Sequence, residues 1–220
     1  MKKRKNRKKS RSNLKIGLAI LLFVLVVLLF YELFFSDKYK EKKNAVIDAS
    51  KPDIEVALLS VNPYSRPGLS TNKIRNIVVH YTANPGSTAM GNRNYFEGLK
   101  DSKITQASSN FVVGLEGEIV QCVPTWEVAY ASNDRNLDSV SIEFCHLDES
   151  GVPNEDTYNS LVHLCAWLCL KFELNEEDII RHFDVSGKNC PKYFVEDEAA
   201  FIAFKEDVKA AIDKGDQSLE

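Results

Sequence analysis

Acidic residues are absent from the first fifteen positions of this 220-residue chain, which carry nine Lys and Arg residues instead. The other 205 residues hold 19 basic and all 31 acidic residues, so the formal net charge of −3 describes neither part. No basic stripe follows the head, which argues against a nucleic-acid-binding domain. No internal repeat is visible, and an aromatic content of 10% excludes a disordered or fibrous chain.

Histidine and cysteine are also scarce, with four and five residues respectively. Because five is an odd number, the cysteines cannot all pair in disulfides within one chain. Cys165 and Cys169 lie one turn apart on a predicted helix, so we expect them to pack as apolar residues. A second metal site built from Cys122, Cys145, Cys165 and Cys169 is the alternative.

One long hydrophobic run, residues 16–35, has 18 apolar or aromatic residues in 20. A helix of about 20 residues spans the hydrocarbon core of a bilayer, whereas a buried core helix would be less uniformly apolar. A cleaved signal peptide would have a shorter run, of roughly 7–15 residues, and a small-x-small cleavage site. The flank at 34–39 has no such site and no cysteine for lipidation. We therefore predict an uncleaved transmembrane signal anchor.

The charges on the two sides of this run predict its orientation. The basic head, residues 1–15, carries nine cations, and the flank at 37–43 carries four lysines. The positive-inside rule then predicts a single-pass anchor in the cell membrane, with the N-terminus in the cytoplasm and the residues after the span outside the cell. A nucleic-acid arm is the other interpretation of the head. Because the head lies directly before the predicted membrane span, we interpret it as a topology signal that contacts anionic lipid.

The part after the anchor divides into three segments. Residues 36–70 are predicted to be a stalk and an N-terminal arm, in which the extended stretch 54–59 packs on the domain. Residues 71–213 are predicted to form one domain, with a core of its own. Residues 214–220 are predicted to be a tail.

Strands and helices alternate along this domain. Short β-branched or alternating runs predict strands over 74–80, 110–115, 118–123, 139–145 and 179–182, with a hairpin turn at Glu116-Gly117. Helical spacing predicts helices over 88–100, 156–172 and 196–212, the second capped by Asp156 or Thr157. Strands interleaved with helices predict an α/β fold with a central mixed β-sheet flanked by helices.

Three residues have the chemistry of zinc ligands. His80 ends the first strand of the domain, and His182 and Cys190 are eight residues apart across a loop with a glycine. Two imidazoles and one thiolate leave a fourth zinc position for water, as in catalytic sites. By spacing alone, core histidines and a buried free cysteine fit equally well. We expect His163 to be a surface or packed residue of its helix, and His146 to face substrate or solvent.

Four motifs follow one another along the chain: Asn76-Ile-Val-Val-His80-Tyr-Thr-Ala-Asn84, then Phe111-Val-Val-Gly114 with Gly117-Glu-Ile-Val-Gln121, then Ser141-Ile-Glu143, and then Arg181-His-Phe-Asp-Val-Ser-Gly-Lys-Asn-Cys-Pro191. Together they resemble the zinc-dependent N-acetylmuramoyl-L-alanine amidases of type 2. That family includes phage amidases called lysozymes and the animal peptidoglycan recognition proteins. The resemblance runs from about Val61 to Val208.

The resemblance implies a role for each matching residue. His80, His182 and Cys190 would bind Zn²⁺, and Glu143 would be the general base. Lys188 would stabilise the developing oxyanion or assist the leaving group. The alternatives are an edge carboxylate on a solvent face for Glu143 and a solvated loop lysine for Lys188. Asp184 is expected to orient a ligand histidine or the loop.

The chain departs from the family pattern at two places. Asn110 stands where the family often has His, and Tyr130-Ala131 stands where it often has Trp-His. Those positions line the family's substrate groove, so we predict that Asn110 and Tyr130, together with His146, contact substrate.

The resemblance implies a membrane-anchored enzyme whose substrate is peptidoglycan. It would cut the amide bond between N-acetylmuramic acid and L-alanine. One rival is a binding module that recognises muropeptides without cutting them. Another is an interaction protein of a division or sporulation complex that uses the same fold as a scaffold.

Overall fold

The computed structural model describes residues 22–27 and 47–216. The chain divides into two units, at positions 1–46 and 47–220, and each is described by itself. In the first unit, residues 22–27 are helical. The rest of the predicted anchor over 16–35 lies outside the described residues, as do the basic head and positions 36–46 and 217–220. Among the helices that are described, none has both the length and the apolarity to cross a bilayer.

Six strands of the second unit form one mixed sheet in the order β1-β4-β3-β5-β2-β6. Their bounds are Glu55–Val56 (β1), Asn76–Tyr81 (β2), Phe111–Val113 (β3), Ile119–Gln121 (β4), Ser139–Phe144 (β5) and Ile179–Arg181 (β6). The hairpin β3–β4 is antiparallel, whereas the other neighbouring strands run parallel. The predicted mixed sheet, its five strands and the hairpin are therefore confirmed.

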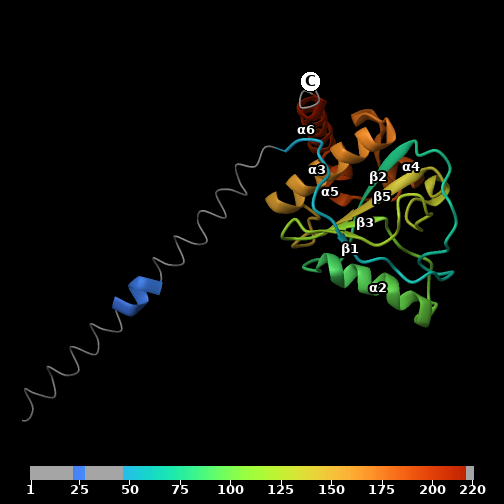
Figure 1. Ribbon diagram of the computed structural model, residues 1–220, viewed down its shortest axis with the longest axis horizontal. Helices are drawn as coiled ribbons and strands as arrows, with labels where there is room; N and C mark the ends of the chain where they lie inside the picture. The colour runs from blue at the N-terminus through green and yellow to red at the C-terminus, as the bar shows by residue number, and fades with distance from the viewer. Residues whose placement is uncertain (1–21, 28–46, 217–220) are drawn as a thin grey trace, which may run out of the picture. The chain divides into compact units, whose positions relative to one another are not determined.

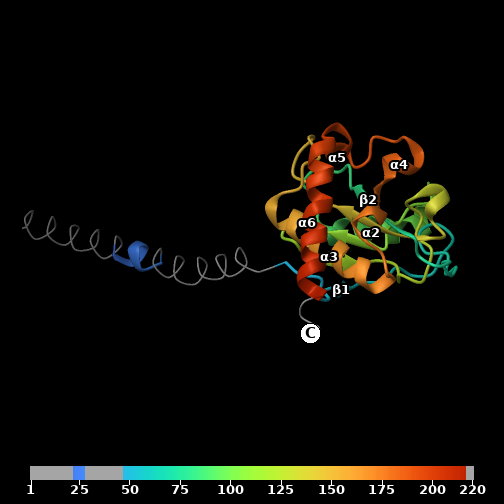
Figure 2. The same ribbon diagram turned by 90° about the horizontal axis from the view of Figure 1, so that it is seen from above.

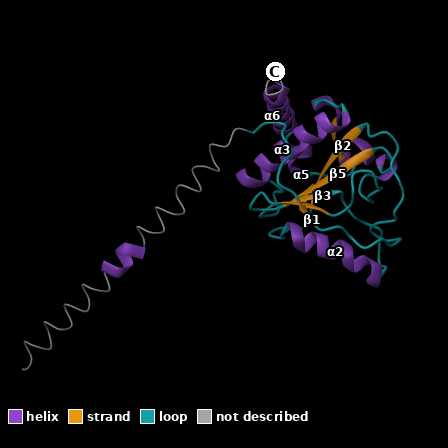
Figure 3. Ribbon diagram, viewed as in Figure 1, coloured by secondary structure: helices purple, strands orange, loops and turns teal. Residues whose placement is uncertain are grey.

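Helices cover both faces of this sheet. Helix α2 (Ala89–Ser102) lies along one face, and α3 (Glu155–Phe172) and α6 (Glu198–Asp216) lie on the other (Figures 1 and 3). Seen from above, α6 lies alongside α3 (Figure 2), and these two helices pack closely. The α/β fold with a sheet between helices is confirmed.

Successive side chains of the strands point to alternate faces of the sheet, and an apolar cluster lies on each face. Ile77 and Val79 of β2 and Ile142 of β5 join the cluster under α3 and α6, and all three are fully buried. Because successive side chains of a strand point to opposite faces, His80 and Glu143 point to the side of α2. The hydrophobic pattern of β2 and β5 thus sets the direction of both polar side chains.

Two helix ends differ from the prediction. Helix α3 is capped by Asn154, whose Oδ1 accepts from the Thr157 amide at 2.9 Å, and not by Asp156 or Thr157. Asn154 has the extended backbone of a cap, whereas Thr157 already lies in the first turn. The predicted helix over 196–212 is interrupted at Asp197, whose extended backbone separates α5 (Lys192–Glu196) from α6.

The arm before the domain packs on it, as the extended stretch 54–59 predicts. Strand β1 pairs with β4 at the edge of the sheet. Arg66 then ties the arm to the domain, because its guanidinium donates to both carboxylate oxygens of Glu127 at 2.7 Å and to the Leu59 carbonyl at 2.8 Å. All three groups are largely shielded from water, so this ion pair is a specific contact between the arm and the domain.

The packing prediction for the cysteines is also confirmed. Cys165 and Cys169 are fully buried in the cluster under α3 and α6, and both are free thiols. The remaining three cysteines are buried and free as well.

Arg66→Ala should lower the free energy of unfolding by about 2 kcal/mol, because it leaves the shielded Glu127 carboxylate without its two charged hydrogen bonds. Lys209→Ala is the matched control, since it removes the partly exposed Lys209–Glu176 pair, at 2.8 Å. That change should stay within about 0.5 kcal/mol. Urea unfolding of both variants measures the difference, and equal losses would contradict a specific role for Arg66.

Candidate active site

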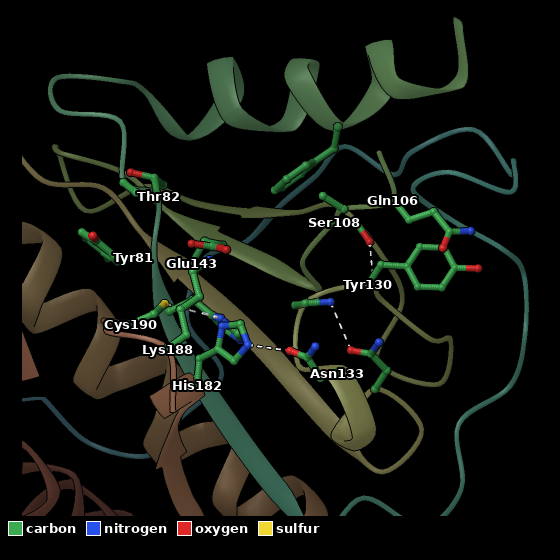
Figure 4. A pocket seen from close by; sticks show the side chains of 16 residues that line it. Tyr81, Thr82, Gln106, Ser108, Tyr130, Asn133, Glu143, His182, Lys188 and Cys190 are labelled. Carbon is green, nitrogen blue, oxygen red and sulfur yellow. Dashed lines mark hydrogen bonds between the residues drawn. The ribbon is translucent and has the colours of Figure 1, made fainter. Parts of the chain in front are cut away.

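A cavity of about 420 Å³ opens at the carboxyl ends of the parallel strands β2 and β5 (Figure 4). In open α/β sheets this end of the strands is where ligands bind. Its lining includes most of the residues that the sequence singles out: His80, Tyr130, Glu143, His182, Lys188 and Cys190. Segments far apart in the sequence therefore meet in one concave site.

Three of these residues form a compact, buried group of potential metal ligands. One ligand atom each from His80, His182 and Cys190 lies within 4.8 Å of the others. The Cys190 Sγ is 3.8 Å from the His80 Nδ1, and the two imidazole centroids are 4.6 Å apart. A Zn–N bond of about 2.0 Å and a Zn–S bond of about 2.3 Å can together bridge the distance between the Cys190 Sγ and the His80 Nδ1.

The local backbone explains how His182 and Cys190 come together. His182 begins the short helix α4 (His182–Ser186), directly after β6. Gly187 ends this helix with φ +75°, a left-handed conformation that glycine adopts at little cost. The chain then turns back, and the Phe183 amide donates to the Cys190 carbonyl at 2.9 Å. The glycine between the two candidate ligands thus allows the reversal.

Asp184 fixes this loop from outside the cavity. Its carboxylate accepts from the Arg181 backbone amide at 2.8 Å and from the Arg181 guanidinium at 2.9 Å. Arg181 also donates to the Phe194 carbonyl at 2.9 Å. Of the two roles expected for Asp184, the contacts fit orientation of the loop.

Burial keeps the three potential ligands uncharged when no cation is present. It lowers the pKa of His80 well below its usual value, with the neighbouring His182 and Lys188 adding to the effect. Burial also lowers the pKa of His182 and raises that of the Cys190 thiol to about 12. A neutral imidazole has a free lone pair that can bind a metal ion. A buried thiol loses its proton when a cation lies close to it.

Glu143 lies beside this group in the middle of the sheet. Strand β5 lies between β3 and β2, so Glu143 is not on an edge strand, and in the parallel register it is the direct partner of His80. Burial raises the pKa of its carboxyl to about 8, although Lys188 acts in the opposite direction. Its Oε2 is buried and has no hydrogen-bond partner within the described part of the chain.

Lys188 and Tyr130 contribute to the more open part of the cavity. Lys188 is exposed, two residues before Cys190, and its charge influences both His80 and Glu143. Tyr130 lines the cavity on the other side, and its backbone amide donates to the Ser108 hydroxyl at 2.9 Å (Figure 4).

Two predicted substrate contacts lie elsewhere. Asn110 is 1% exposed and outside the cavity lining; its Oδ1 accepts from the Ser141 amide at 2.9 Å and its Nδ2 donates to the Pro124 carbonyl at 3.1 Å. Its amide is thus used to join strands and loops. His146 is also 1% exposed, and its Nδ1 is 2.7 Å from the Asp148 carbonyl. Neither position fits the predicted contact with substrate or solvent.

His163 lies on α3, away from the cavity, as expected for a packed or surface residue. Its Nε2 is 2.9 Å from the Ser50 carbonyl of the arm.

The sequence prediction missed two residues that contact the histidines. The Ser132 hydroxyl is 3.1 Å from the His80 Nε2, and the Asn133 Oδ1 is 2.7 Å from the His182 Nε2. Both come from the polar loop before β5. Their only sequence signal is a cluster of Ser, Asn and Asp, which is typical of any turn.

Comparison with known proteins identifies the family that this sequence matches. The sequence profile described as N-acetylmuramoyl-L-alanine amidase matches residues 70–193. A probable N-acetylmuramoyl-L-alanine amidase of Bacillus licheniformis is 34% identical over 166 residues, which cover 70% of this chain and 46% of that protein. The amidase BlyA of Bacillus subtilis strain 168 is 34% identical over 173 residues, covering 69% and 46%. The chain thus spans about half the length of these relatives.

Solved structures share the fold over most of their length. The structure of PlyL superposes with a TM-score of 0.62 at 25% identity and covers 73% of this chain and 99% of its own. The PlyG catalytic domain has the same TM-score of 0.62 at 24% identity and covers 73% of this chain and 96% of its own.

Glu143 should make the metal-free protein less stable as the pH rises from about 6.5 to about 8. Its folded pKa is near 8 against 4.5 for the free side chain, so at the lower end of this range the folded state holds close to one proton more than the unfolded state. Stability should then fall by about 1.4 kcal/mol per pH unit there, and by about half of that at pH 8, where the folded carboxyl is half ionised. The two histidines with lowered pKa act in the opposite direction, but only below about pH 6.5.

Glu143→Gln should remove this slope, with the exposed Glu206→Gln as the matched carboxylate-to-amide control. Urea unfolding in the presence of a chelator at pH 6.5, 7.25 and 8 measures both variants. An unchanged slope in Glu143→Gln would show that this carboxyl is ionised in the folded protein.

Proposed function

Because the chain belongs to the N-acetylmuramoyl-L-alanine amidase family, we propose that it hydrolyses the amide bond between N-acetylmuramic acid and L-alanine of peptidoglycan. The observation that carries this proposal is the convergence of His80, His182, Cys190 and Glu143 in one cavity at the carboxyl ends of the strands. A binding module needs a cavity, but it does not need three buried ligand atoms beside a buried carboxyl.

The ligand group fits a Zn²⁺ ion. The His182 Nδ1 is buried and has no hydrogen-bond partner within the described residues, which is costly unless something binds it. Two imidazoles and one thiolate leave one zinc position for water. Zinc held by these residues would supply a water whose pKa is lowered to about 7 and would polarise the scissile carbonyl.

Glu143 is the general base in this proposal. Its Oε2, which has no hydrogen-bond partner among the described residues, can accept a proton inside the cavity. The charge of a bound divalent ion would favour the carboxylate form that a base needs, against the effect of burial on the pKa of this group. The same carboxyl can afterwards return the proton to the departing amine of L-alanine. The proposed role of Glu143 therefore depends on its position in the cavity as well as on its carboxyl group.

Lys188 and Tyr130 act on the substrate. The exposed ammonium of Lys188 can approach the carbonyl oxygen, where negative charge appears in the transition state. Tyr130 offers a ring and a hydroxyl on the opposite wall, suited to a sugar or peptide group. Together they define two walls between which the scissile amide would lie.

The full-length protein should release new N-terminal alanine from purified peptidoglycan, and a chelator should abolish the release. Glu143→Gln should lower the rate by about 10²–10⁴-fold, as expected for loss of a general base. Lys188→Ala should lower it by about 10²-fold, as for loss of one electrostatic stabiliser. The exposed Lys51→Ala is the control for a lost surface charge.

Cys190→Ala should abolish both zinc binding and alanine release. Tight binding to peptidoglycan with no release in the presence of zinc would contradict the enzyme and favour the muropeptide-binding module. A biological role that persists in Glu143→Ala would favour the scaffold protein.

We also propose that residues 16–35 anchor the chain in a cell membrane, with the N-terminus in the cytoplasm and the domain outside. The uniformly apolar run and the nine cations before it support this proposal. It would hold the domain on the side of the membrane where peptidoglycan is found.

Protease added to intact protoplasts should digest the domain and leave the head protected. Replacing the basic residues of positions 1–15 with neutral ones should weaken this orientation, because the charge difference across the span is then lost. A domain that resists protease until the protoplasts are lysed would contradict the proposed topology.

A further inference from the structure

The two histidines of the candidate metal site use the same ring nitrogen, Nε2, for a contact outside the group of potential ligands. The His80 Nδ1 faces the Cys190 Sγ at 3.8 Å, and the His182 Nδ1 is the buried ring nitrogen without a partner in the described chain. Each Nε2 instead contacts a polar side chain of one loop. The His80 Nε2 is 3.1 Å from the Ser132 hydroxyl, and the His182 Nε2 is 2.7 Å from the Asn133 Oδ1 (Figure 4). Ser132 and Asn133, which are adjacent in the sequence, therefore each contact the Nε2 atom of one ring.

We propose that Ser132 and Asn133 are positioning residues of the metal site, which hold both imidazoles in the form that carries its proton on Nε2 and offers its lone pair on Nδ1. A neutral imidazole has one N–H and one acceptor nitrogen, so an acceptor at Nε2 fixes the proton there. The amide oxygen of Asn133 can only accept a hydrogen bond. The Ser132 hydroxyl can donate or accept, and it accepts when the Cys190 thiol donates to the His80 Nδ1, because the proton of the ring is then on Nε2. This inference rests on the metal-binding part of the proposed function.

The loop that carries the two residues is itself held in place. The Asn136 Oδ1 accepts from the Ser132 amide at 2.6 Å and from the Ala131 amide at 3.1 Å. Arg135 donates to Asp138 at 2.8 Å, and its carbonyl accepts from the Ser139 hydroxyl at 2.7 Å at the start of β5. These contacts within the chain position the loop beside the two rings.

Asn133 has a backbone conformation that few residues accept. Its φ is +49°, in the left-handed region that asparagine enters more readily than most residues other than glycine. Glycine would meet the backbone requirement, but it has no amide to reach His182. Asparagine satisfies both, and strain of this kind at a site is typical of a functional constraint.

Asn133→Gly separates the two requirements, since it keeps the left-handed backbone and removes the side-chain acceptor. Lys103→Gly is the matched control, because Lys103 also has a left-handed backbone, with φ +55°, and ends α2 outside the cavity lining. Ser132→Ala removes the second acceptor. Asn133→Asp keeps an acceptor at the same place.

The full-length protein and these variants are titrated with Zn²⁺ against a chromophoric chelator. Asn133→Gly and Ser132→Ala should each weaken the zinc affinity by about 10–100-fold, as is typical for outer partners of metal-bound histidines. Asn133→Asp and Lys103→Gly should stay within about threefold of the parent on the same scale.

Nitrogen-15 spectra of the histidine-labelled, metal-free protein give a second readout, which a merely structural role would not move. The parent should show His80 and His182 with the proton on Nε2, and only four histidines need assignment. Asn133→Gly should give a mixture of the two forms for His182 and leave His80 unchanged. Ser132→Ala should do the reverse.

Unchanged zinc affinity and unchanged proton positions in Asn133→Gly and Ser132→Ala would overturn the inference. If Asn133→Gly melts at a lower temperature than the metal-free parent, Ser132→Ala and Asn133→Asp decide the question. A parent protein that binds no zinc would instead overturn the metal part of the proposed function, so the two failures are distinguishable.

Discussion

The parallel pairing of β2 with β5 is the constraint on which the site depends. This register makes His80 the direct partner of Glu143, and the hydrophobic alternation of both strands turns the two side chains to the same face. A slip of one residue in either strand would move its polar group into the cluster under α3 and α6. The same apolar residues that stabilise the sheet therefore determine the geometry of the candidate active site.

The remaining residues reach this point by loops that begin at the same edge of the sheet. Strand β6 delivers His182 directly into α4, and the turn at Gly187 brings Cys190 back beside it. The polar loop before β5 lies on the other side of the two rings. Strands thus fix the positions of His80 and Glu143, and the loops between elements supply the groups that complete the site.

The sequence predicts this arrangement in part, for physical reasons. The β-branched run that ends at His80 and the alternation around Glu143 predict buried strands, because burial favours such patterns. The pattern does not say which polar side chains near a strand end are used for structure. The Asn110 Oδ1 accepts from the Ser141 amide, and the His146 Nδ1 lies close to the Asp148 carbonyl, so both side chains make contacts within the protein that the pattern does not predict. Ser132 and Asn133 were missed because loop residues carry no periodic signal.

The electrostatics of the cavity account for the choice of these residue types. Burial raises the pKa of Glu143 and Cys190 and lowers that of His80 and His182, so without a cation the buried groups are disposed to be neutral. A divalent ion would reverse this preference for the two acids, since its charge favours a thiolate and a carboxylate. The exposed Lys188 acts on Glu143 in the same direction. The acidic balance of the domain contributes little here, because its charges are mostly on the surface, where water and salt screen them.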